Sequence, residues 1–174
     1  MKRCTIVIRD AGPIISLWVA DQLPLLLALD MQIVVIDAIY DELTSNPSYL
    51  KDSAIKAFIE GNQPPFVIEG TEIGQRERDV RLNGGKLKKN ALEVAVAEFM
   101  SSEDGLRKYL GSGDPVVILF EDARAQAFNK PSHLHLISTV GMFRGLERVG
   151  VISSAKAIIH EMTHPSKPDR TRQH

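Results

Sequence analysis

Five short apolar runs, each long enough for a buried strand, alternate along the chain with segments of helical spacing. The runs cover residues 4–9, 31–36, 66–70, 116–120 and 134–138. They show little alternation of polar and apolar residues, which is typical of strands that are buried on both faces of a parallel sheet. The pattern predicts an α/β fold: a three-layer α/β/α domain around a central, mainly parallel sheet of about five strands.

The segments between the runs predict the helical layers. We expect helices within residues 14–20, 25–30, 38–43, 49–60, 90–100, 123–128, 140–149 and 153–162, and a short helix within the polar stretch 101–115. Residues 70–89 are charged and contain Gly84 and Gly85, so they form either a loop or a mobile helix. Pro165 predicts the end of the last helix. We therefore expect one domain over residues 1–163 and a disordered basic tail over residues 164–174.

Composition narrows the classes of protein further. A length of 174 residues suits a single domain with one core. The single cysteine, Cys4, excludes an intrachain disulfide and a multi-cysteine zinc site. No apolar run approaches the roughly 20 residues that span a bilayer, and residues 1–10 do not resemble a signal peptide. We expect a cytoplasmic protein. The net charge of −1 does not indicate nucleic-acid binding, although basic residues cluster locally within 76–89 and 167–172.

Acidic residues follow the apolar runs or lie in the helices after them. They are Asp10, Asp37, Asp41, Glu42, Glu93, Glu121 and Asp122. Parallel strands end at one edge of the sheet, where such folds bind ligands, so these acids should lie near one another. Neighbouring carboxylates repel unless a cation neutralises them, and Mg²⁺ or Mn²⁺ prefers such oxygen ligands. Any one of these acids is alternatively a residue that stabilises a helix start, and for Asp41 and Glu121 this alternative stays open.

Three parts of the sequence together resemble PIN domains. Residues 6–43, IVIRDAGPIISLWVADQLPLLLALDMQIVVIDAIYDEL, are similar to the opening of that family, in which an acid ends the first strand and a Glu lies on the helix after the second. Residues 90–100, NALEVAVAEFM, resemble the later helix that supplies a third acid. Residues 116–150 resemble the fourth strand, its acidic turn, and the closing strand and helix. The resemblance covers about residues 4–160.

The resemblance implies a set of site residues. Asp10 would be the first acid, Glu42 the second, Glu93 the third and Asp122 the fourth, with Glu121 as a near rival of Asp122. Asn90 could be aligned in place of Glu93. One or two Mg²⁺ or Mn²⁺ ions would be held by Asp10, Glu42, Glu93, Glu121 and Asp122. Arg124 would hold the RNA backbone.

The function that the resemblance implies is hydrolysis of RNA phosphodiesters by metal-activated water, as in the toxins of toxin–antitoxin pairs. A small antitoxin and a homodimer are the partners to expect in that case. The sequence also departs from the family: Ala11 and Gly12 stand where many relatives have hydroxylated residues, and Phe120 stands where many have Thr or Asp. These departures favour an alternative, a catalytically degenerate PIN-like module that binds RNA or a protein.

Other motifs carry less weight. Residues 160–164 read His-Glu-Met-Thr-His, but Pro165 disfavours helical structure at the second histidine, and no familiar third zinc ligand follows. Residues 111–114 precede a strand and lack the Lys-Ser/Thr of a phosphate-binding loop. A receiver-like domain would need a lysine at the end of the last strand, which residues 134–138 do not supply. Trp18 is expected in the core or in a dimer contact.

Overall fold

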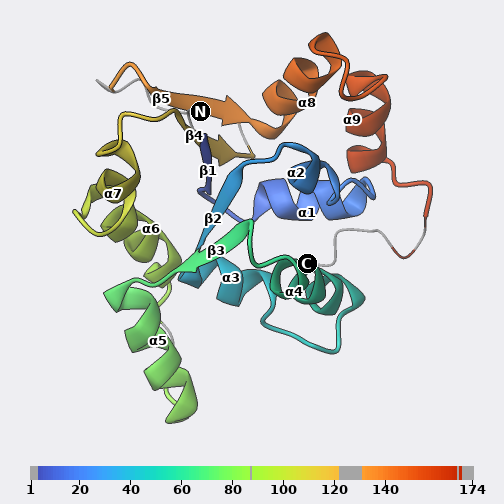
Figure 1. Ribbon diagram of the computed structural model, residues 1–174. Helices are drawn as coiled ribbons and strands as arrows, with labels where there is room; N and C mark the ends of the chain where they lie inside the picture. The colour runs from blue at the N-terminus through green and yellow to red at the C-terminus, as the bar shows by residue number, and fades with distance from the viewer. Residues whose placement is uncertain (1–3, 87, 122–130, 168, 170–174) are drawn as a thin grey trace.

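A sheet of five parallel strands forms the centre of the molecule (Figure 1). The computed structural model describes residues 4–86, 88–121, 131–167 and 169. The strands are β1 (Thr5–Ile8), β2 (Gln32–Ile36), β3 (Phe66–Glu69), β4 (Val116–Phe120) and β5 (Leu134–Ser138). Their order across the sheet is β3-β2-β1-β4-β5, and every neighbouring pair is parallel. The predicted α/β fold with its central parallel sheet is therefore confirmed.

Helices cover both faces of this sheet, as expected for a three-layer α/β/α fold (Figure 1). One face carries α1 (Gly12–Val19), α2 (Leu25–Ala28), α4 (Leu50–Gly61), α8 (Thr139–Arg148) and α9 (Ala155–Thr163). The other face carries α6 (Ala91–Ser101) and α7 (Leu106–Leu110). Two helices lie at the carboxyl edge of the strands: α3 (Asp37–Leu43) packs beneath β2 and β3, and α5 (Glu72–Leu82) projects away from the sheet.

The core lies where the strands meet the helical layers. Ile33, Val34, Val35 and Ile36 of β2 are fully buried, which explains why the strand sequence shows no polar alternation. Trp18 is also buried, with 1% of its surface exposed, so the expectation of a core position for this residue is confirmed. It is therefore not available as a platform for stacked bases.

Residues 70–89, for which the sequence predicted either a loop or a mobile helix, contain helix α5. Its first-turn amides are capped from two sides. The Thr71 side chain accepts a hydrogen bond from the Gly74 amide at 2.9 Å, and the Glu98 carboxylate of α6 accepts from the amides of Glu72 and Ile73 at 2.7 and 3.1 Å. These contacts satisfy amides that have no partner within the helix. The polar segment is thus a helix because α6 supplies part of its cap.

The last helix, α9, ends close to Pro165, as the sequence predicted. Helix α9 ends at Thr163, just before Pro165, and Ser166 donates to the Glu161 carboxylate at 2.9 Å. Lys167 contacts Asp21 at the end of α1. The predicted helix 123–128 and most of the predicted tail lie outside the described residues. Among the helices that are described, none is long and apolar enough to cross a membrane.

Candidate functional site

Asp10 lies just beyond the carboxyl end of β1, the central strand of the sheet. The strand order reverses direction between β1 and β4, and α/β proteins of this kind bind ligands at that point. Asp10 bridges the two strand ends. Its Oδ1 accepts a hydrogen bond from the Gly12 amide at 2.9 Å, and its Oδ2 accepts one from the Glu121 amide at 3.2 Å. The carboxylate is therefore fixed at the point where the sheet can receive a ligand.

Gly12 has a steric role in this arrangement. A Cβ atom at this position would lie 2.4 Å from the Glu121 Cβ and 2.8 Å from Asp10 Oδ1, distances at which atoms collide. The small residue after Asp10 thus lets the turn out of β1 pass close to the turn out of β4. A larger side chain at this position is incompatible with the observed packing.

Glu121 is held by two hydroxyl groups. Ser16, fully buried in α1, donates to its Oε1, and Thr139 at the start of α8 donates to its Oε2 at 2.8 Å. Sequence reasoning missed both hydroxyl residues, because they lie 105 and 18 positions away from Glu121. The turn after Asp10 contains no hydroxylated residue, but Ser16 on α1 and Thr139 on α8 place hydroxyl groups at the site. Glu121 orients the Asp10 carboxylate through its amide, and its own carboxylate faces these helices.

The pKa of Glu42, on α3, is raised by burial and by the charges of two other acids, Asp10 and Glu93. Burial raises its pKa most, and the negative charge of Asp10 raises it further. The nearby cation of Lys51 lowers the pKa, and the charge of Glu93 raises it again. The Glu42 side chain is nonetheless exposed to solvent. The charges of Asp10 and Glu93 therefore disfavour the ionised form of Glu42.

The pKa of Asp10 is raised as well. Burial is the main cause, and the two backbone amides that donate to the carboxylate oppose it. The charge of Glu121 raises the pKa and that of Arg9 lowers it. A partly buried acid near other acids is a group that a bound cation would stabilise in its charged form.

Glu93 and Asp10 line the same cavity, which has a volume of about 630 Å³. Its other walls come mostly from apolar side chains of α6, β4 and β5. Ala95 and Phe99, on the stripe that predicted α6, are buried, and this places Glu93 in the first helical turn on the cavity side. Of the two alternatives for the third acid, Glu93 is the one that shares this cavity. Asn90 precedes the helix and does not line it.

Asp37 and Asp41 have a structural partner instead. Arg78 of α5 donates to Asp37 Oδ2 at 2.7 Å and to Asp41 Oδ2 at 3.0 Å. Thr71 adds a hydrogen bond to Asp37 Oδ1 at 2.8 Å, and Asp37 is 3% exposed. These two acids therefore tie α5 to α3. No sequence signal linked them to an arginine about 40 positions away.

Several predicted features cannot be placed or do not assemble. Asp122 and Arg124 lie outside the described residues. Within the described ranges, no three His, Cys, Asp or Glu side chains stand close enough together to hold a metal ion. His160 lies within α9, whereas His164 follows the last helical residue, Thr163. The two histidine rings stack with a centroid distance of 4.9 Å. The histidine pair therefore does not form the two-ligand face of a zinc protease.

The fold and the site define a three-layer α/β/α protein with a parallel sheet, in which Asp10 and Glu121 lie at the switch point of the strand order. Comparison of the chain with protein-family models, curated proteins and solved structures finds no match.

Proposed function

We propose that this chain is a metal-dependent endoribonuclease of the PIN-domain type, which hydrolyses RNA phosphodiesters at the carboxyl edge of its sheet. The observation that carries the proposal is that Asp10 and Glu93 line one cavity and that Glu42 lines the adjoining cavity, with Leu92 in the shared wall. Besides burial, the charges of Asp10 and Glu93 raise the pKa of Glu42. Three acids from three separate elements share one electrostatic environment. Such an arrangement opposes folding unless it serves a cation.

The donor chemistry fits Mg²⁺ or Mn²⁺. Asp10, Glu42 and Glu93 offer only carboxylate oxygens, the ligands that these hard ions prefer. Magnesium also keeps several waters, so the protein need not supply its whole shell. Asp122 completes the proposed ligand set. Glu121, whose carboxylate accepts from Ser16 and Thr139, positions Asp10 through its amide instead.

Each residue has a role in the proposed reaction. A bound divalent ion would supply Lewis acidity and lower the pKa of water. The amides of Gly12 and Glu121 hold the Asp10 carboxylate in one orientation toward the site. Glu42 is suited to accept the proton of the attacking water at its carboxylate, because its pKa lies above that of an ordinary Glu. Arg124 would contact the RNA backbone. A cytoplasmic location, a homodimer and a small antitoxin complete the proposal.

The test is cleavage of a single-stranded RNA with Mn²⁺ by the wild type and by Asp10→Asn, Glu42→Gln and Glu93→Gln. We expect each variant to lose activity by about 100-fold or more. Glu103→Gln is the control, because Glu103 is highly exposed and pairs only with Arg107. An inactive wild type, or variants that cleave as fast as the control, would refute the nuclease. RNA binding without cleavage would favour the degenerate PIN-like module.

A further inference from the structure

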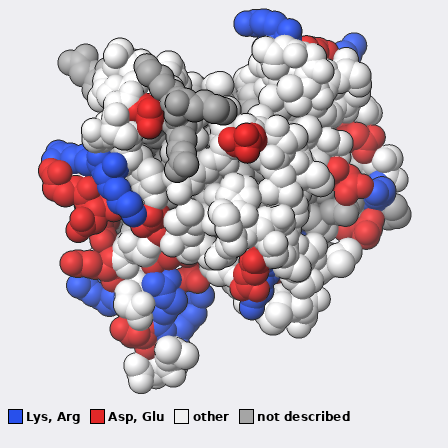
Figure 2. Space-filling model, viewed as in Figure 1, with Lys and Arg blue, Asp and Glu red and all other residues white. Residues whose placement is uncertain are grey.

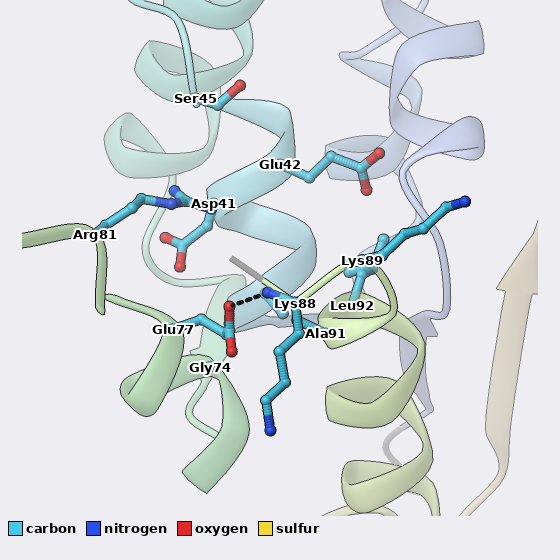
Figure 3. Close-up of a pocket in the computed structure, with 11 residues that line it drawn as sticks. Asp41, Glu42, Ser45, Gly74, Glu77, Arg81, Lys88, Lys89, Ala91 and Leu92 are labelled. Atoms are coloured by element: carbon cyan, nitrogen blue, oxygen red, sulfur yellow. Dashed lines mark hydrogen bonds between the residues drawn. The ribbon is translucent and has the colours of Figure 1, made fainter. Parts of the chain in front are cut away.

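A second cavity, of about 300 Å³, lies next to the acidic site between α3, α5 and the start of α6 (Figure 3). Glu42 lines it. Leu92 lines both this cavity and the one that contains Asp10 and Glu93, so the two cavities share a wall. Three cationic side chains, which we call the basic cluster, also line it: Arg81, Lys88 and Lys89.

Among the described residues, no carboxylate forms an ion pair with a side chain of the basic cluster. Two further acids line the cavity: Asp41 accepts from Arg78, and Glu77 accepts from the backbone amide of Lys88 at 3.3 Å. Unpaired cations beside a cavity are available to an anionic ligand.

The backbone that carries the basic cluster is anchored. The turn after α5 places Gly84 at φ 70°, a conformation that favours glycine, and its amide donates to the Arg81 carbonyl at 3.0 Å. The Gly85 amide donates to the Val80 carbonyl at 2.9 Å. In Figure 3, Lys89 extends on the same side as Glu42, whereas Lys88 points between α5 and α6. The cations thus reach the cavity from the end of α5 and from the segment that precedes α6.

Figure 2 shows that charged side chains of both signs gather over the α5–α7 side of this face, while the centre of the face is largely uncharged. The cationic side chains on this side of the molecule are therefore interspersed with carboxylates. RNA carries one negative charge per phosphate, and proteins fix its position mainly through such backbone contacts.

We infer that the basic cluster is the subsite that binds the RNA backbone phosphates flanking the scissile phosphodiester. The inference rests on the proposed function for the identity of its ligand. Arg81 and Lys89 lie on opposite sides of α3 in Figure 3, and Lys88 points between α5 and α6. Contacts of this kind position the strand and carry no base preference.

The test measures binding of a fluorescein-labelled single-stranded RNA by anisotropy in EDTA, so that cleavage does not contribute. The variant Arg81→Ala/Lys89→Ala is compared with Arg76→Ala/Lys86→Ala, which removes the same residue types from exposed positions that do not line the cavity. We expect the first variant to bind roughly tenfold more weakly, uniformly across sequences. Its slope of log affinity against log salt should be shallower by about 1.4, since each phosphate contact to a single strand contributes about 0.7.

Equal affinities and slopes for the two variants would overturn the inference, as would a wild type that does not bind RNA in EDTA. Binding of an acidic peptide instead, lost in Arg81→Ala/Lys89→Ala, would assign the cavity to a protein partner and also overturn it. Failure of the proposed function is a separate result, because that failure is the absence of Mn²⁺-dependent cleavage by the wild type.

Discussion

Glu42 illustrates how a single carboxylate can be unfavourable for folding and useful for a site. Burial and the charges of Asp10 and Glu93 raise its pKa, and no hydrogen bond to its carboxylate compensates among the described residues. Asp10 differs, because two backbone amides stabilise its charged form. Of the two residues, Glu42 is therefore the better place to measure the electrostatic repulsion at the site.

We predict that Glu42→Gln stabilises the metal-free protein near neutral pH. A raised folded pKa means that the folded state binds more protons than the unfolded state between the ordinary Glu value of 4.5 and the raised value. The free energy of unfolding of the wild type therefore falls as pH rises through that window, and the penalty is fully present above it. Solvent exposure limits the expected gain in Tm to about 1–3 °C.

The measurement is thermal unfolding in EDTA at neutral pH and below about pH 4, where both states are protonated and the gain should vanish. Glu103→Gln, at an exposed position, should show no gain at either pH. A lower Tm for Glu42→Gln at neutral pH would contradict the assigned repulsion.

Sequence reasoning could place some of these residues and not others. Asp10 could be placed because it follows an apolar strand directly, a local signal. Asp37 follows its strand in the same way, yet it pairs with Arg78 and Thr71. Asp10 and Asp37 look alike in the sequence, because each follows an apolar strand. They differ in the structure because α5 packs against Asp37 and supplies its partner Arg78. Ser16 and Thr139 were missed for the same reason, since a hydrogen bond between distant segments leaves no local pattern.

At the level of secondary structure, α5 depends on its contacts with α3 and α6. Gly74 approaches α3 so closely that a Cβ atom there would lie 2.3 Å from Asp37 Oδ2. The ion pair of Asp37 with Arg78 lies at the same contact. A side chain at position 74 would therefore push α5 away from α3 and disrupt the ion pair between Asp37 and Arg78.

We predict that Gly74→Ala lowers the free energy of unfolding by about 2–3 kcal/mol, although Ala favours a helix by about 1 kcal/mol. Gly145→Ala in α8 is the matched control, since its Cβ would meet no atom within 4 Å. The control should gain about 0.5–1 kcal/mol. Urea unfolding of both variants measures the difference. A Gly74→Ala protein as stable as the control would show that α5 does not dock as described.

The strands were predictable because each is a short apolar run whose burial is encoded locally. Helix α5 was not, because its sequence is polar and its first-turn amides are capped by Glu98, 26 and 25 residues away from Glu72 and Ile73. A segment that depends on a distant cap reads as a loop in the sequence alone.

Across the whole molecule, the strand order brings distant acids to one edge. Asp10, Glu42 and Glu93 are dispersed over more than 80 positions, and the parallel sheet brings the elements that carry them to its carboxyl end. The near-zero net charge hides this arrangement, because the acidic site and the adjacent basic cluster cancel in the total. The positions of the charged residues indicate a site in this protein, whereas the net charge does not.

The central claim is that Asp10, Glu42 and Glu93 bind a divalent cation, in part through waters that the cation keeps. Calorimetric titration of the metal-free protein with Mn²⁺ at neutral pH tests it most directly. We predict saturable binding of about one or two ions per chain by the wild type and by Glu103→Gln. Asp10→Asn and the double variant Glu42→Gln/Glu93→Gln should each bind at least about tenfold more weakly. Absence of saturable binding by the wild type, or unchanged affinity in both variants, would contradict the claim.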